Sequence, residues 1–589
     1  MQIRRRGLLG AMFASVGASL LRTKFAVAAG SRRVRPGMSG WPSAENWAGL
    51  GRAVQGRLAP VSLPVLGQAE APKLLSNPFY LGDQPGLTQV SGWVDGWRSA
   101  PSAYVVKAKD AADVAEAVRF ARAHRLRLVV KGGGHSYLGG SNAPDSLLVW
   151  TRAMDAIEVH DAFAPSGCAT APTPAVSLGA GCLWLHAYAA VTTGAGRYVQ
   201  GGGCTTVGVA GLVQGGGFGS FSKAYGLAAA SLLEAEIVTA DGKTRIVNAC
   251  REPDLFWALK GGGGGTFGVV TRLTLRTHDL PQAFGAARWT IKAKSDDAFR
   301  RLLARFIDEY ATNLFNPHWG EQVRASRGNQ LTIEMVFQGL DQQAARAAWQ
   351  GLSAFVAAHP EDYEIVEPLL VFALPARHFW DQAFLSRYAP GVISSDNRPG
   401  ARPTDFWWAG DGDQAGTFWH GYTSAWLPAS LLKGEGQAKL VDAWFAASRH
   451  WSVSFHFNKG LAGASDPTIA ASRDTAMNPQ VLEAFALAII ASEGPSAFAG
   501  LPAPNLAGAR FEAASIQAAM HALREAAPDA GNYLSECDYF NENWRRATWG
   551  EHWETLSRIK RRYDPEGLFV VHHGVGSEDW SPDGFTQLT

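Results

Sequence analysis

Three glycine-dense stretches constrain this chain more than any other feature of its sequence. They are residues 132–134, 201–219 and 261–265, in a chain of 589 residues that contains 65 glycines. Glycine lacks a Cβ, so its backbone N–H groups can approach a ligand that a larger residue would hold away. Glycine loops that follow strands often hold phosphate groups in this way. The sequence therefore predicts a fold arranged around a phosphate-bearing ligand.

The order of elements around these stretches excludes the common nucleotide-binding folds. Only Gly263-x-Gly265-x-x-Gly268 has the spacing of a dinucleotide fingerprint, but an expected helix over 254–259 precedes it and an expected strand over 269–275 follows it. The fingerprint requires the reverse order, and no lysine follows any loop as in a nucleotide triphosphatase. A larger cofactor spread over two or three loops remains.

Two nucleophilic residues stand inside these loops. His135 follows the first glycine run, and Cys204 lies within the second. Each alone could be a polar loop residue with a satisfied hydrogen bond. Because the surrounding loops carry almost no other side chains, the pair is also suited to bond to an electrophilic ring.

The ordered motifs of the chain resemble the FAD-linked oxidases of the vanillyl-alcohol-oxidase and p-cresol-methylhydroxylase fold, in their berberine-bridge-enzyme-like branch. The motifs are Val129-Val130-Lys131-Gly132-Gly133-Gly134-His135-Ser136-Tyr137, Gly203-Cys204-Thr205-Thr206-Val207-Gly208, Tyr225-Gly226-Leu227, Val238-Thr239-Ala240-Asp241-Gly242, Asp254 to Leu259, Gly268-Val269-Val270 and Tyr563-Asp564-Pro565…Phe569. The resemblance covers roughly residues 95–280 and 530–575.

The resemblance implies an α+β fold: a two-subdomain FAD-binding domain of the p-cresol-methylhydroxylase type, and an inserted substrate lobe with an antiparallel sheet flanked by helices. It implies FAD bonded through its 8α-methyl to His135 and through carbon 6 to Cys204, with the pyrophosphate on Gly132 to Ser136. The implied cofactor-binding residues are Lys131, Gly132, Gly133, Gly134, His135, Ser136, Tyr137, Gly203, Cys204, Thr205, Thr206, Val207, Gly208, Gly211, Gly217, Tyr225, Gly226, Val238, Gly268 and Val269.

The chain departs from the family pattern at three places. Thr205 replaces a frequent proline after the cysteine, and Leu212 stands where a histidine often lies near the flavin. The run Asn532 to Asp538 replaces the usual asparagine and tyrosine residues, so the family's catalytic tyrosine cannot be transferred to this chain.

Glu536 and Tyr533 are the candidates for the catalytic base, because they lie where the chain is expected to return to the flavin. The alternative for Glu536 is a salt bridge to Arg545 or Arg546. His456, Asn458 and Glu334 are the candidate substrate residues, because they lie on the polar faces of two alternating strands. A solvent-exposed face is the alternative for both strands.

The expected domains are a signal peptide over 1–28, an extended arm over 29–93, the FAD-binding domain over 94–279, the substrate domain over 280–528, a C-terminal segment over 529–575 that returns to the FAD domain, and a tail over 576–589. Arg5-Arg6, an apolar stretch and Ala26-Val27-Ala28 indicate export by the twin-arginine machinery to the periplasm or beyond. No apolar run is long enough for stable membrane insertion.

Charge and cysteine content narrow the function classes. A net charge of +2 does not favour a nucleic acid as a partner, and His572-His573 has no further ligand to complete a metal site. Five cysteines leave at least one thiol unpaired, and folding in a reducing cytoplasm argues against essential disulfides.

The expected function is the oxidation of a small-molecule alcohol, carbohydrate or phenolic, by hydride transfer to covalent FAD, with O2 as acceptor and H2O2 as product. The same fold working as a dehydrogenase with another acceptor is the nearest alternative. A remote alternative is a non-catalytic protein whose tryptophans hold sugars or aromatic molecules.

Overall fold

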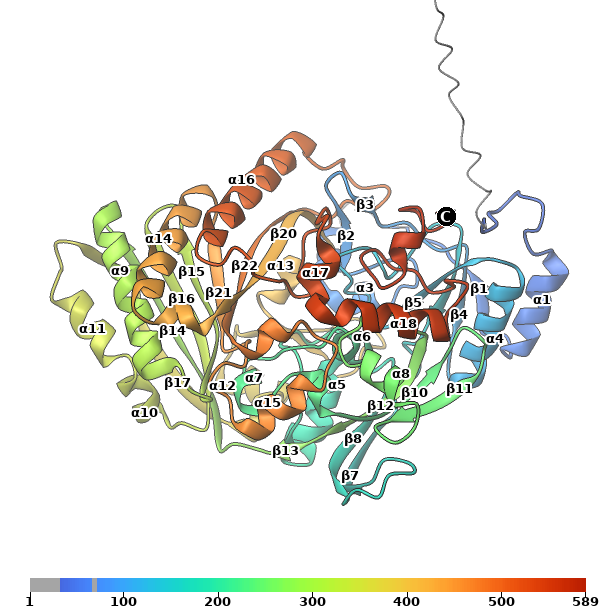
Figure 1. Ribbon diagram of the computed structural model, residues 1–589, viewed down its shortest axis with the longest axis horizontal. Helices are drawn as coiled ribbons and strands as arrows, with labels where there is room; N and C mark the ends of the chain where they lie inside the picture. The colour runs from blue at the N-terminus through green and yellow to red at the C-terminus, as the bar shows by residue number, and fades with distance from the viewer. Residues whose placement is uncertain (1–31, 66–70, 589) are drawn as a thin grey trace, which may run out of the picture.

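The computed structural model describes residues 32–65 and 71–588. They form two α+β lobes side by side, with the C-terminal helices α17 (Trp544–Trp549) and α18 (Trp553–Tyr563) lying across the lobe that contains α4 and β10 (Figure 1). The expected signal peptide falls outside the described residues.

The first lobe begins with a small sheet in the order β1-β4-β6-β5. The sheet is covered by helix α4 (Ala111–Ala123), which begins as expected at Asp110, whose side chain accepts a hydrogen bond from the N–H of Asp113. Val114, Ala117 and Val118 of α4 are buried against the sheet. Its strands are β1 (Leu58–Pro60), β4 (Tyr104–Lys107), β5 (Arg127–Lys131) and β6 (Ser146–Trp150).

The second sheet of this lobe is antiparallel, in the order β11-β10-β12-β8-β7. A disulfide between Cys168 and Cys250 joins the loop after β7 to the loop after β11. Among the described cysteines, Cys182, Cys204 and Cys537 are free, so one pair forms rather than two. The strands are β7 (Ile157–Phe163), β8 (Thr173–Gly179), β10 (Leu232–Val238), β11 (Thr244–Asn248) and β12 (Val269–Arg276).

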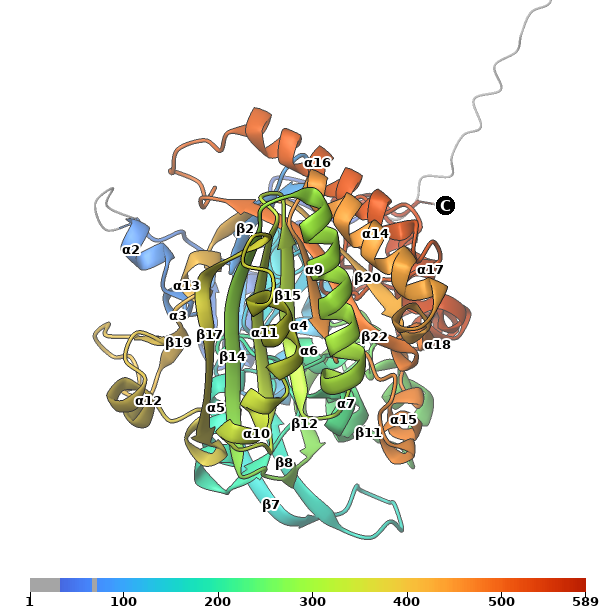
Figure 2. The same cartoon turned by 90° about the vertical axis from the view of Figure 1, so that its left-hand side faces the viewer.

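The second lobe is built on a nine-stranded sheet in the order β17-β14-β16-β15-β21-β22-β20-β2-β3. Helices α9 (Asp296–Glu309), α14 (Glu435–His450) and α16 (Leu506–Arg524) cover its outer face (Figure 2). The strands are β2 (Val90–Trp93), β3 (Trp97–Arg98), β14 (Ala283–Ala293), β15 (Trp319–Ser326), β16 (Gln330–Gln338), β17 (Tyr363–Pro375), β20 (Thr417–Pro428), β21 (Val453–Phe457) and β22 (Ala484–Gly494).

Alternation along the strands decides which side chains meet the helices and which face the first lobe. Val453, Phe455 and Phe457 of β21 are buried in the core beneath α9 and α14. Ser454 and His456 therefore project from the opposite, inner face of the sheet.

The segment before residue 94 is not an extended arm. It contains α1 (Ala44–Ala53), β1, α2 (Ala71–Leu75), α3 (Pro78–Gly82) and β2, and β2 pairs in parallel with β20 of the second lobe. The ring of Trp47 stacks on Tyr104 with centroids 4.0 Å apart. These elements are held by packing on distant residues, which a short, glycine-rich stretch does not reveal by periodicity.

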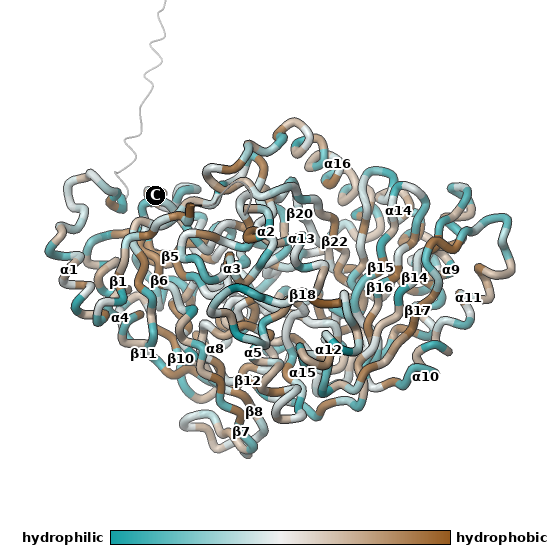
Figure 3. Tube along the Cα trace, turned by 180° about the vertical axis from the view of Figure 1, so that it is seen from behind, coloured by the Kyte–Doolittle hydropathy of each residue, from teal (hydrophilic) through white to brown (hydrophobic). Residues whose placement is uncertain are grey.

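Hydrophobic stretches follow strands in both lobes, whereas hydrophilic stretches recur at the periphery (Figure 3). Within the described ranges, no helix combines the length and apolar character needed to cross a bilayer.

Candidate functional site

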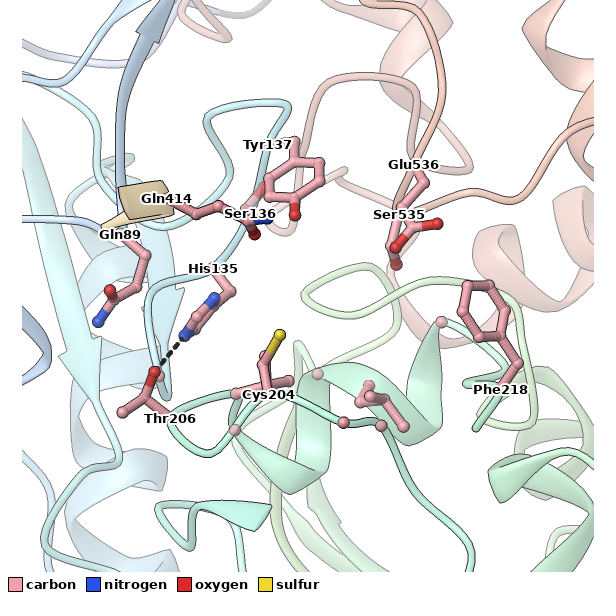
Figure 4. Close-up of a pocket in the computed structure, with 18 of the residues that line it drawn as sticks. Gln89, His135, Ser136, Tyr137, Cys204, Thr206, Phe218, Gln414, Ser535 and Glu536 are labelled. Carbon is pink, nitrogen blue, oxygen red and sulfur yellow. Dashed lines mark hydrogen bonds between the residues drawn. The ribbon is translucent and has the colours of Figure 1, made fainter. Parts of the chain in front are cut away.

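A cavity of about 1000 Å³ lies between the glycine loops of the first lobe and the inner face of the nine-stranded sheet. One side, the glycine wall, consists of Gly132–Gly134, Gly202–Cys204 and Gly263–Gly265. The carboxylate wall consists of Glu321, His456 and Glu536. Figure 4 shows His135, Cys204 and Glu536 arranged around the same space.

The glycine wall depends on direct contact between two loops. A Cβ on Gly133 would lie 2.7 Å from both the N atom of Gly208 and the carbonyl oxygen of Thr206. Gly134 has a φ of +82°, which favours glycine. The first loop can therefore reach the second only because its residues carry no side chains at these points.

His135 follows this contact and is held by the second loop. Its Nε2 atom lies 3.0 Å from Oγ1 of Thr206. Burial lowers the pKa of His135 to about 4, so the imidazole is neutral at neutral pH. A neutral imidazole keeps one ring nitrogen with a free lone pair, which is the nucleophilic form.

Cys204 stands where the second loop opens into the cavity. A Cβ on the neighbouring Gly203 would meet no atom within 4 Å. Sγ of Cys204 lies 3.8 Å from Oδ1 of Asp411, and the negative charge of Asp411 together with burial raises the pKa of the thiol well above its usual value. Cys204 is consequently a protonated thiol at neutral pH.

Glu536 reaches the cavity from the C-terminal segment. Its Oε2 atom is buried without a hydrogen-bond partner, and within the described chain Glu536 forms no salt bridge with Arg545, Arg546 or any other cation. Burial raises its pKa to about 7. The surface salt bridge considered from the sequence is therefore wrong, and Glu536 has the properties of a proton acceptor.

Tyr533 also lines the cavity, but it is packed more deeply. Its ring centroid lies 4.6 Å from that of Phe218, and burial raises its pKa above the usual value. The phenol is therefore neutral, which favours Glu536 over Tyr533 as the base.

A charged cluster that the sequence did not reveal completes the carboxylate wall. Nζ of Lys459 lies 3.0 Å from Oε1 of Glu321, and Nδ1 of His456 lies 3.8 Å from Oε2 of Glu321. Although burial opposes ionisation, Lys459 and His456 together with Ser220 lower the pKa of Glu321 to about 2. Glu321 has a φ of +67° within β15, which is strained for a residue other than glycine.

An aromatic cluster lines the cavity beside these charges. The ring centroid of Tyr137 lies 4.9 Å from that of Trp419 and 5.1 Å from that of Tyr422. Tyr137 was expected from its loop motif. Trp419 and Tyr422 come from β20, and only strand alternation could have indicated their direction.

Two of the three candidate substrate residues do not face the cavity. Asn458 follows the end of β21 with a φ of +56°, which breaks the strand alternation, and its Nδ2 donates to the carbonyl of Trp319 at 2.6 Å. Its Oδ1 accepts from the hydroxyl of Tyr310 at 2.6 Å. Glu334 lies outside the lining, with Oε2 3.7 Å from a guanidinium nitrogen of Arg324.

The implied cofactor-binding residues divide into lining and supporting positions. Lys131 points away from the cavity, since its Nζ donates to the carbonyls of Gln84, Pro85 and Leu87. Thr205, Gly217, Tyr225, Gly226, Val238, Gly268 and Val269 also lie outside the lining. The expected residues that line the cavity are Gly132, Gly133, Gly134, His135, Ser136, Tyr137, Gly203, Cys204, Thr206, Val207, Gly208, Gly211, His456, Tyr533 and Glu536.

Comparison with known proteins agrees with this arrangement. Residues 101–248 match the FAD binding domain family, and residues 523–576 match the berberine and berberine-like family. An FAD-linked oxidoreductase from Aspergillus versicolor is 30% identical over 598 residues, which cover 94% of this chain and 90% of that protein.

Solved structures share the fold. The VAO-type flavoprotein MtVAO615 from Myceliophthora thermophila C1 is similar with a TM-score of 0.75 at 26% identity, over 94% of this chain and 98% of that chain. The glucooligosaccharide oxidase of Acremonium strictum, which carries 6-S-cysteinyl, 8α-N1-histidyl FAD, is similar with a TM-score of 0.60 at 19% identity, over 81% and 92% of the two chains.

Proposed function

Because the chain belongs to the FAD-linked oxidoreductases of the VAO type, with a berberine-like C-terminal segment, we propose that it is an exported alcohol oxidase with FAD bonded to both His135 and Cys204. One observation carries this proposal. A neutral imidazole and a thiol from two glycine loops face one cavity, and an unpaired carboxyl lies on the other side of it.

The residues of the cavity fit FAD. The backbones of Gly203 and Gly211 border open space that a Cβ would begin to fill, and the glycine wall leaves N–H groups accessible to phosphate oxygens. The same two residue types, cysteine and histidine, are named as the flavin links of glucooligosaccharide oxidase, whose fold this chain shares. His135 and Cys204 would hold the ring covalently, with Gly132 to Ser136 at the pyrophosphate.

The chemistry that FAD supplies when bound is the acceptance of a hydride from a substrate carbon. Glu536 then accepts the proton of the substrate hydroxyl, because a carboxylate with a pKa of about 7 binds a proton more strongly than an ordinary glutamate. Tyr533 supports the geometry of this segment, since the N–H of Glu536 donates to the carbonyl of Tyr533 at 3.0 Å.

The walls of the cavity favour a polar substrate with a flat or ring-shaped body. His456, Ser452 and Ser454 offer hydrogen-bonding groups from the sheet, and Trp419 and Tyr422 offer aromatic edges and faces. This combination suits a carbohydrate or a phenolic alcohol.

Oxygen use and export are further parts of the proposal. Val207 lines the cavity, and its small side chain favours access of O2 to the reduced cofactor, with H2O2 as product. The twin arginine at residues 5–6 supports export, and the Cys168–Cys250 disulfide is suited to an oxidising compartment.

The test is an absorbance spectrum of the purified protein, repeated on its acid-precipitated and washed pellet. Yellow colour that stays with the pellet, and that is lost in the double variant His135→Ala/Cys204→Ala but in neither single variant, is the expected result. Release of H2O2 during turnover of alcohols in air, and its absence without O2, would support the oxidase. Colour that leaves the pellet of the wild-type protein would contradict covalent attachment, and turnover that needs another acceptor would contradict oxygen use.

A further inference from the structure

Asp411 lies against the Cys204 loop on a segment inserted between the strands of the second lobe. It is the first residue of the short helix α13 (Asp411–Gln414), which follows strand β19 (Phe406–Trp408). The indole N–H of Trp408 donates to the carbonyl of Gly203 at 3.0 Å, which anchors the segment to the residue before Cys204. The carboxyl group of Asp411 is thereby held beside the thiol.

No cation accounts for the position of this carboxyl group. Oδ1 of Asp411 lies 3.8 Å from Sγ of Cys204, and Oδ2 is buried without a hydrogen-bond partner. The inserted segment has its own arginines, but Arg398 pairs with Asp83 and Asp396, and Arg402 pairs with Asp155. Throughout the described chain, Asp411 enters no salt bridge.

A buried carboxylate without a cation is costly, so its retention beside a reactive group calls for a chemical role. Only the thiolate of cysteine is an effective nucleophile. The charged groups that act on Cys204 are Asp411 of α13, Glu536 of the C-terminal segment, Glu321 of β15 and Lys459 after β21. Together they hold the thiol protonated, so Cys204 needs an adjacent base before it can form a bond. Burial raises the pKa of Asp411 to about 6, which makes its carboxylate a better proton acceptor than an ordinary aspartate.

We infer that Asp411 is the base that removes the proton of Cys204 while the sulfur–carbon bond to the flavin forms. This inference rests on the proposed attachment through Cys204. One S–H bond and one ring C–H bond break, and one S–C bond forms at carbon 6 of the flavin ring. The two electrons and two protons that are released reduce one molecule of O2 to H2O2. Asp411 acts in maturation and has no part in the oxidation of substrate.

The experiment compares wild-type protein with Asp411→Asn and with Asp413→Asn, all expressed with FAD and purified in air. Asp413 is a matched control, because it lies in the same helix and is exposed to solvent. Intact mass, peptide mapping and alkylation of free Cys204 under denaturing conditions measure each covalent link separately. We expect Asp411→Asn to keep the His135 link and to reduce the Cys204-linked fraction by about tenfold or more, since general-base assistance contributes about a hundredfold or more to a rate. Asp413→Asn should match wild type.

A purely structural role for Asp411 is separated from catalysis by pH. Incubation of Asp411→Asn in air at higher pH should increase the Cys204-linked fraction, because solvent hydroxide then removes the thiol proton. A linked fraction in Asp411→Asn equal to that of wild type overturns the inference, and so does a low fraction that pH does not restore. If Asp411→Asn fails to hold flavin at His135, Asp411→Glu decides: formation of the Cys204 link supports the inference, and its absence beside a normal His135 link overturns it. Absence of the Cys204 link from wild-type protein instead overturns the proposed attachment itself.

Discussion

The glycine wall presents backbone groups and two nucleophilic side chains, whereas the carboxylate wall presents ionisable side chains from three distant segments. The glycine wall comes from motifs in which neighbouring residues act together, such as Gly133, Gly134 and His135. The carboxylate wall joins Glu321 of β15, His456 of β21 and Glu536, which are separated by up to about two hundred residues. One wall is therefore written locally in the sequence, and the other exists only after the lobes have folded together.

The glycine wall should be the more sensitive of the two to a small change. Gly133→Ala places a Cβ 2.7 Å from backbone atoms of the second loop. Because backbone cannot yield as a flexible side chain does, we expect a loss of about 1–3 kcal/mol in unfolding free energy. We also expect the flavin content to fall by about tenfold or more. Acid-stable absorbance and thermal unfolding measure both effects.

Gly328→Ala is the control for this change, because a Cβ at that exposed turn would meet no atom within 4 Å. Flavin content and unfolding temperature that respond equally to both substitutions would show that the contact between the two loops has no special importance.

The carboxylate wall should affect the rate rather than the binding of the cofactor. Glu536→Gln keeps the shape of the side chain but cannot accept a proton, so we expect flavin to remain bound and its reduction by substrate to slow by about a hundredfold. In wild-type protein the rate of reduction should rise with pH through a midpoint near the Glu536 pKa of about 7. Anaerobic stopped-flow measurements over a pH series test both expectations.

Glu334→Gln is the matched control, because Glu334 lies outside the cavity and should leave reduction unchanged. Equal reduction rates in wild type and Glu536→Gln would remove Glu536 from the mechanism.

Asn458 distinguishes a structural polar residue from a substrate-binding one. Asn458→Ala leaves the buried carbonyl of Trp319 and the hydroxyl of Tyr310 without their partner. We expect a loss of about 2–3 kcal/mol in unfolding free energy, with KM for the substrate unchanged. Chemical denaturation and steady-state kinetics measure the two quantities, and a raised KM with unaltered stability would restore Asn458 to the substrate site.

The smallest effect concerns the stability cost of the catalytic carboxyl group. The pKa of Glu536 is raised from 4.5 to about 7, so the folded state retains a proton that the unfolded chain has released within this range. The contribution is therefore present below about pH 4.5 and is lost as the pH rises to about 7. Above that value Glu536→Gln should exceed wild type by about 1–3 kcal/mol in unfolding free energy. Denaturation of both holoenzymes across this pH range should show the difference vanish at the acidic end.

Local pattern was enough to predict much of the first lobe. Asp110 begins α4 as expected, and the order of helix and strand around Gly263–Gly268 agrees with the structure. His135 and Cys204 could be selected because each stands in a loop with few other side chains. The inward face of β21 was also predictable up to His456, since side chains alternate along a strand.

Prediction ended where a contact depended on distant residues. The helix α1 and strand β1 are held by packing on α4 and β4, and Asn458 turned inward because its φ of +56° ended the alternation of β21. Lys131 belongs to the glycine motif, yet its ammonium group binds three carbonyls of residues 84–87.

The sequence by itself determined the glycine loops, their two nucleophiles and the class of cofactor, because those features depend on neighbouring residues and on the absence of side chains. The tertiary structure alone decided which charges surround them. Glu321 and Lys459 form their pair, and Asp411 lies beside Cys204, only after separate segments have met. The pKa of a buried group depends on that meeting, because burial and neighbouring charges both arise from the folded arrangement.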